Sequence, residues 1–135
     1  MKQGRREAAI TERNKILVAE GDSQSRRAIH LLLISLGYEV RAYATGIAVL
    51  NDPQVQDAAA LIVDEQLPDI GGQQLLKIMR ETGWHGAAVL VSANRTPECV
   101  NQAVAQGFSE VVARPIKDLR LTDLVHRLVR NVVRV

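Results

Sequence analysis

The chain has 135 residues, 47% of them hydrophobic and 24% charged, which fits one domain with a sizeable core. With 17 basic and 15 acidic residues, the net charge of +2 is too small and too dispersed to favour a nucleic-acid or membrane partner. A single cysteine, no apolar stretch long enough to span a bilayer and no apolar segment behind the basic N-terminus together predict a cytoplasmic protein without disulfides.

Residues 1–13 are polar and predict an N-terminal arm outside the core, so the domain itself is expected over residues 14–135. From Lys15 onward, short apolar runs alternate with amphipathic stretches. The runs predict five strands: Lys15–Ala19, Glu39–Ala42, Ala59–Val63, Ala87–Val91 and Glu110–Ala113. They are rich in Val, Ile and Leu without strict alternation, which is typical of strands buried on both faces of a parallel sheet.

Helices are predicted in the gaps. The first begins at a Ser23 or Ser25 cap and runs to Leu36, where Gly37 ends it. The others are expected from Thr45 to Leu50, from Gly72 to Glu81, from Thr96 to Gly107, and from about Asp118 to the end of the chain. Alternating strands and helices predict right-handed crossovers and one parallel sheet.

The apolar stripe of the last predicted helix is widened by Val129 and Val133. These side chains lie either in the core or on a patch that faces a partner. We favour the patch.

Four of the apolar runs are followed by, or end in, polar side chains: Glu20, Asp64, Ser92 and Arg114. Because parallel strands end at the same edge of a sheet, where open α/β folds bind ligands, these groups are expected to face one another. Two carboxylates, a hydroxyl and a guanidinium suit phosphoryl chemistry with a divalent cation.

This pattern resembles the receiver domain of two-component response regulators, from Lys15 to about Val132. The resemblance rests on the acidic end of the first strand and on three later features: the Asp64 loop with Leu67-Pro68 and Gly72, Ser92 after the fourth strand, and the basic-Pro pair Arg114-Pro115. It implies a flavodoxin-like three-layer sandwich, in which a five-stranded parallel sheet of order 2-1-3-4-5 is flanked by five helices.

The resemblance also implies residue roles and partners. Asp64 would be the phosphoacceptor, Ser92 would donate to a phosphoryl oxygen, and Arg114 would contact the same phosphate in place of the usual lysine. Mg²⁺ would be held by Glu20, Asp64 and the main-chain carbonyl of Gln66. The phosphoryl group would come from a histidine kinase or phosphotransfer protein. The apolar stripe of the last helix separately suggests contact with an output protein or a second copy of the chain.

Several positions depart from the family pattern. Gly21 stands where a second acid is usual, so we expect weak Mg²⁺ binding, with Asp22 one position further on and pointing elsewhere. Arginine at position 114 carries a planar guanidinium, whereas the usual lysine carries a compact ammonium group. The longer side chain can pair with Asp64 when phosphate is absent. Val111 replaces the usual aromatic switch residue and, being β-branched, has few rotamers to switch between.

The sequence leaves two other functions to consider. The alternative to a phosphorylated receiver is a degenerate receiver that binds proteins without using phosphorylation or Mg²⁺. A small phosphatase or flavin enzyme on a related fold is disfavoured, because the sequence has neither a second catalytic Asp after Asp64 nor a Gly-rich phosphate loop. No DNA-binding segment follows Val135, so we expect the output in a partner or in further sequence.

Overall fold

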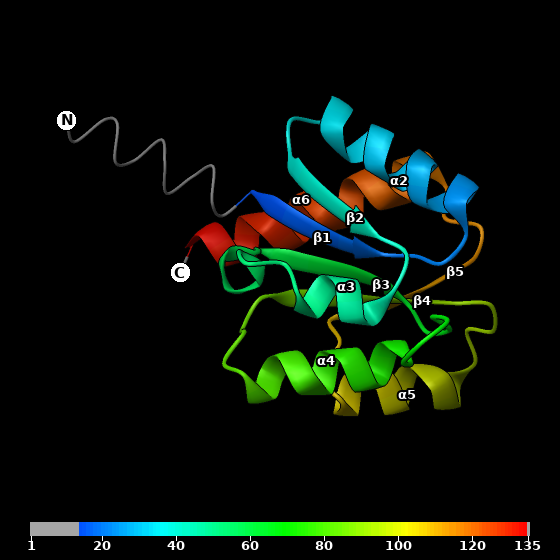
Figure 1. The fold of residues 1–135 in the computed structure, drawn as a ribbon. Helices are drawn as coiled ribbons and strands as arrows, with labels where there is room; N and C mark the ends of the chain where they lie inside the picture. Colours follow the sequence, from blue (N-terminus) through cyan, green and yellow to red (C-terminus); the bar gives the residue numbers. More distant parts are fainter. Residues whose placement is uncertain (1–13, 135) are drawn as a thin grey trace.

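The computed structural model describes residues 14–134, with side chains to residue 129; the arm predicted for residues 1–13 lies outside this range. Its strands are β1 (Lys15–Ala19), β2 (Glu39–Tyr43), β3 (Ala60–Asp64), β4 (Ala87–Ser92) and β5 (Glu110–Ala113). All neighbouring strands pair in parallel, in the order β2-β1-β3-β4-β5 (Figure 1). The predicted flavodoxin-like sheet is confirmed, with each predicted strand boundary within one residue.

The described part of the chain contains five α-helices and one 3₁₀ turn that the sequence pattern did not predict. They are α2 (Ser23–Ser35), α3 (Gly46–Leu50), the turn η1 (Val55–Asp57), α4 (Gly72–Glu81), α5 (Pro97–Ala105) and α6 (Asp118–Arg134). Within residues 14–134, we find no helix with the length and apolar character needed to cross a membrane.

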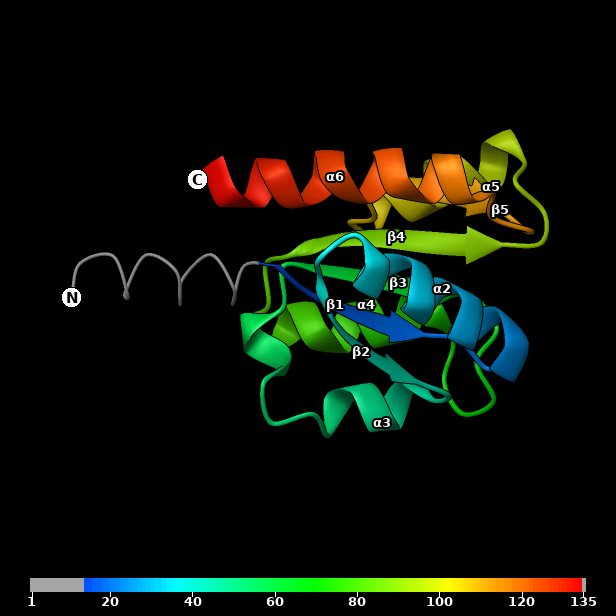
Figure 2. The same cartoon turned by 90° about the horizontal axis from the view of Figure 1, so that it is seen from above.

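The sheet is the middle of three layers. Helices α2 and α6 cover one face, and α3, α4 and α5 cover the other (Figures 1 and 2). Successive strand residues point to opposite faces, so each strand supplies both cores. Leu17, Leu61 and Leu90 pack toward α4 and α5, whereas Val18 and Ile62 pack toward α2 and α6. This double burial explains the continuous apolar runs.

The helix ends follow local chemistry, with one correction. Helix α2 is capped by Asp22, whose carboxylate accepts the Ser25 N–H at 2.8 Å, and not by the predicted Ser23 or Ser25. A carboxylate one residue earlier in the chain serves equally well as an N-cap, so composition alone did not separate the candidates. Helix α5 begins as predicted, with Thr96 as the cap and Pro97 in its first turn.

The position of Val129 corrects a second prediction. Its side chain is only 4% exposed and packs with the core of the α2–α6 face, so it is a core residue and not part of a partner-facing patch. The side chain of Val133 lies outside the described residues. Among its described side chains, helix α6 carries a strongly exposed apolar one, Leu119, in its first turn.

Candidate functional site

The predicted site residues meet at the carboxyl edge of the sheet. Glu20 follows β1, Asp64 ends β3, Ser92 ends β4 and Arg114 follows β5. The parallel register places Asp64 opposite Val91 and Ser92 opposite Ala113, so these strand ends are level. Glu20, Asp64 and Ser92 are buried, and a surface hollow opens beside them. Its lining consists of Glu20, Gly21, Asp22, Asp64, Glu65, Gln66, Leu67, Pro68, Ala93 and Arg114.

The guanidinium of Arg114 links two carboxylates. Its Nη2 atom donates to Glu20 Oε1 at 3.1 Å and to Oε2 at 3.3 Å, and the same nitrogen forms an ion pair with Asp64 Oδ2. Glu20 and Asp64 have side chains that are 5% exposed, compared with 33% for Arg114. Two buried like charges therefore share one cation, which offsets both their mutual repulsion and part of their desolvation cost.

The backbone around Asp64 is held closely. Asp64 Oδ1 accepts the Gln66 N–H at 2.9 Å, which ties one carboxylate oxygen to the loop after β3. Gly72 passes so near that a Cβ atom there would lie 2.6 Å from the Asp64 carbonyl oxygen. A glycine is therefore required at the start of α4 for this close approach of two backbones.

The segment after β1 is organised by Asp22 and Arg26. The Asp22 N–H donates to Glu20 Oε2 at 3.0 Å, and Arg26 Nη1 donates to the Glu20 carbonyl at 2.9 Å. The hydrogen bond from the Ser25 N–H is the main cause that holds the pKa of Asp22 below its ordinary value. The Asp22 carboxylate is thus engaged as the N-cap of α2, although Asp22 also lines the hollow.

Ser92 has an unexpected partner. Its hydroxyl donates to Glu65 Oε1 at 2.9 Å and accepts the Asn94 N–H at 3.1 Å. Cys99 Sγ lies 3.8 Å from the same hydroxyl oxygen. Sequence reasoning missed Glu65, although its position directly after Asp64, at the end of the strand beside β4, was an available signal.

Val111, predicted to stand at the switch position, lies in the interior. It is 2% exposed and belongs to the core under α4 and α5, and its carbonyl accepts Arg95 Nε at 2.9 Å. Strand β5 therefore contributes a buried aliphatic side chain at this position.

The residues at the hollow provide an incomplete set of ligands for Mg²⁺. Glu20, Asp64 and the carbonyl of Gln66 are hard oxygen donors, which suit a Mg²⁺ ion that keeps several waters. Among residues 14–129, however, no three His, Cys, Asp or Glu side chains gather closely enough to hold a metal. The donor set fits the ion with two carboxylates and not three, and the Arg114 guanidinium competes for both.

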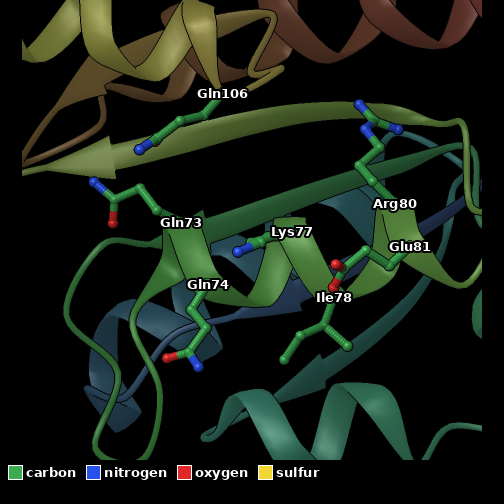
Figure 3. A pocket seen from close by; sticks show the side chains of 7 residues that line it. All are labelled: Gln73, Gln74, Lys77, Ile78, Arg80, Glu81 and Gln106. Atoms are coloured by element: carbon green, nitrogen blue, oxygen red, sulfur yellow. The ribbon is translucent and has the colours of Figure 1, made fainter.

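A second hollow lies away from these residues. It is lined by side chains of α4, with Gln106 reaching in from the end of α5 (Figure 3): Gln73, Gln74, Lys77, Ile78, Arg80, Glu81 and Gln106. None of the four strand-end residues lines it, and it has no convergent set of buried polar groups. The chemistry of the chain therefore points to the hollow at the carboxyl edge of the sheet.

Comparison with known proteins agrees with this geometry. Residues 16–126 match the response regulator receiver domain family. The chain is 28% identical over 124 residues to Protein RcaC of Microchaete diplosiphon, which covers 90% of the chain and 19% of RcaC. It is 32% identical over 101 residues to the transcriptional regulatory protein KdpE of Mycobacterium tuberculosis, which covers 74% of the chain and 44% of KdpE.

The fold is similar to that of solved receiver domains. The BeF3-activated DrrB receiver domain superposes with a TM-score of 0.78 and 25% sequence identity, over 86% of this chain and 97% of that chain. The chain spans less than half the length of RcaC or KdpE, so the similarity concerns one domain of each of these proteins.

Proposed function

This chain belongs to the response regulator receiver domain family, and from that premise we propose that it accepts a phosphoryl group on Asp64. Receiver domains are signalling domains, not enzymes in the usual sense, and they interact with histidine kinases or phosphotransfer proteins. The observation that carries the proposal is the placement of Asp64: a buried carboxylate at the end of β3, with Glu20, Ser92 and Arg114 at the neighbouring strand ends.

The proposed reaction is a transfer from a phosphohistidine. An Asp64 carboxylate oxygen attacks phosphorus while the P–N bond breaks, and the imidazole leaves with the bonding electrons and takes up a proton. Arg114 supplies positive charge for the phosphoryl oxygens, and a free Ser92 hydroxyl can donate to one of them. The acyl phosphate on Asp64 is the product, so the protein itself is the acceptor.

Receiver domains generally bind Mg²⁺ at their acidic site. In this chain we propose that Glu20, Asp64 and the Gln66 carbonyl hold it weakly, because Gly21 supplies no carboxylate and Arg114 already pairs with the other two. When bound, the ion neutralises charge on the phosphoryl oxygens. Arg114 would then neutralise the rest of the negative charge on the phosphoryl oxygens.

The degenerate receiver is the second candidate, and one observation favours it. The ion pairs of Arg114 with Glu20 and Asp64 partly neutralise the acidic site from within the chain. A receiver domain whose carboxylates are neutralised in this way would bind partners through its surface, without phosphorylation. Contact through α6, where Leu119 is exposed, fits either candidate.

One experiment separates the two candidates. The protein is incubated with acetyl phosphate, with and without Mg²⁺, and its intact mass is measured. The proposal expects one added phosphoryl group in the wild type and none in Asp64→Asn. An unchanged mass of the wild type at high Mg²⁺ would favour the degenerate receiver, and modification of the Asp64→Asn variant would place the acceptor elsewhere.

A further inference from the structure

The side chain of Glu65 engages the only proton of the Ser92 hydroxyl. Ser92 Oγ lies 2.9 Å from Glu65 Oε1 and 3.1 Å from the Asn94 nitrogen. Because the Asn94 N–H is itself a donor, the hydroxyl acts as acceptor toward Asn94 and as donor toward Glu65. While this arrangement lasts, Ser92 has no proton to donate to another group.

The backbone of Glu65 is held by two hydrogen bonds, so its side chain, and not its backbone, would turn to release Ser92. The Glu65 N–H donates to the Val91 carbonyl at 3.0 Å, and the Glu65 carbonyl accepts the Gly72 N–H at 3.1 Å. The side chain is half-buried and lines the hollow beside Asp64. It therefore has open space to turn into when the bond to Ser92 breaks.

We propose that Glu65 is a positioning residue that competes with a phosphoryl group on Asp64 for the Ser92 hydroxyl. Glu65 is the neighbour of Asp64, and β4, which ends at Ser92, pairs with β3. A phosphoryl group on Asp64 also adds negative charge next to the Glu65 carboxylate, which disfavours the resting arrangement. Glu65 thus lowers the affinity of the site for phosphoryl oxyanions. The inference rests on the proposed function of Asp64.

The test is a titration with beryllofluoride, a phosphoryl mimic, in the presence of Mg²⁺, followed through the backbone amide signal of Asn94. Glu65→Ala removes the competing acceptor and should bind the mimic about tenfold more tightly, as expected for a lost hydrogen bond to a charged group. Glu65→Gln keeps a neutral acceptor of the same shape. Its affinity for the mimic should lie between those of the wild type and Glu65→Ala, since charge-assisted hydrogen bonds are about twice as strong as neutral ones.

A double-mutant cycle separates the hydrogen bond from the charge. In a Ser92→Ala background, Glu65→Ala should raise the affinity clearly less than it does in the wild-type background, because no hydroxyl remains to be released and only the charge of Glu65 still acts. Glu98→Ala removes an exposed acid from the first turn of α5 and serves as the charge control, with an expected change within about twofold because solvent screens it.

The outcomes distinguish this inference from the proposed function. Wild-type binding that Glu65→Ala leaves unchanged, or an equal gain in the Ser92→Ala background, would overturn the role of Glu65 alone. Binding seen in Glu65→Ala but not in the wild type would support it. Absence of binding in both would overturn the proposed function of Asp64, and the competition with it.

Discussion

Arg114 and Glu20 are joined across the carboxyl edge of the sheet from β5 to β1. Arg114 follows β5 and Glu20 follows β1, yet Arg114 Nη2 lies 3.1 Å from Glu20 Oε1, past the ends of β4 and β3. Asp64, at the end of β3, pairs with the same guanidinium. The cation that balances the acidic site is therefore part of the protein, and a Mg²⁺ ion at this site would have to displace it or share the carboxylates with it.

Gly21→Asp should tighten Mg²⁺ binding by about tenfold, because it restores a carboxylate ligand in a solvent-screened site. The new side chain has room: its Cβ would meet Pro68 Cδ at 3.4 Å, an ordinary contact. Isothermal titration with Mg²⁺ measures the effect, and Gly21→Asn is the control of equal shape without the charge. An equal gain in both variants would show that the added charge is not the cause.

Arg114→Ala should lower the free energy of unfolding by about 1–3 kcal/mol without Mg²⁺, because Glu20 and Asp64 lose their shared partner. Mg²⁺ should then restore more stability to the variant than it adds to the wild type, since its competitor is gone. Urea unfolding with and without Mg²⁺ measures both values. Arg120→Ala removes a surface ion pair to Glu110 and should show no such dependence on Mg²⁺.

Gly72→Ala should destabilise the protein by about 1–3 kcal/mol, because the added Cβ would lie 2.6 Å from the Asp64 carbonyl oxygen and force a backbone shift. The adjacent Gly71→Ala is the matched control, since its Cβ would be 3.6 Å from the nearest atom. Thermal unfolding of the two variants compares them. Equal losses would mean that helix entry, and not the contact with Asp64, is responsible.

Asp52→Asn should cost about 1–3 kcal/mol near neutral pH and less in acid. Burial acts to raise the pKa of Asp52, but hydrogen bonds from the Tyr43 hydroxyl and the Gln54 N–H, with the charge of Arg41, hold that pKa below its ordinary 3.8. The stabilisation is therefore complete above the unfolded pKa and is lost as pH falls below it.

Urea unfolding at about pH 7 and about pH 3 tests whether the stabilisation by Asp52 decreases in acid. The stability difference between wild type and Asp52→Asn should narrow at the lower pH, and Asp57→Asn, an exposed acid in η1, is the control. A difference that widens in acid would contradict the direction of the pKa change.

Beryllofluoride should leave α5 largely unchanged, because Val111 has no ring to move into space vacated near Ser92 and few rotamers to exchange. Amide hydrogen exchange with and without the mimic measures this. We expect new protection around Ser92 and little change from Val100 to Val112. Strong protection across that range would show that the switch operates through another residue.

Much of the fold was predictable because burial on both faces leaves a clear signal in the sequence. The apolar runs marked the strands to within one residue, and the polar residues at their ends marked the site, since parallel topology brings those ends together. Two predictions were wrong: the residue that caps α2 and the exposure of Val129. The cap depends on which of several suitable side chains points at the free N–H. The apolar stripe of a helix does not reveal how much of that stripe the sheet and the neighbouring helix cover.

The contacts within the site were harder to predict than its members. The possibility that Arg114 pairs with Asp64 followed from the reach of arginine, but its bond to Glu20 depends on a path across two strand ends. The bond between Glu65 and Ser92 depends on the side-chain directions of two adjacent strands. Sequence spacing places residues at an edge; rotamers then decide which of them touch.

The burial of Trp84 makes it a spectroscopic reporter. It is the only tryptophan in the chain, it is 1% exposed, and its indole N–H donates to the Ala58 carbonyl at 2.9 Å. Its fluorescence should therefore change when this core is exposed to water during unfolding. Because it lies before β4, at the opposite edge of the sheet from Asp64, emission can follow global unfolding in the variants above while remaining insensitive to the occupancy of the acidic hollow.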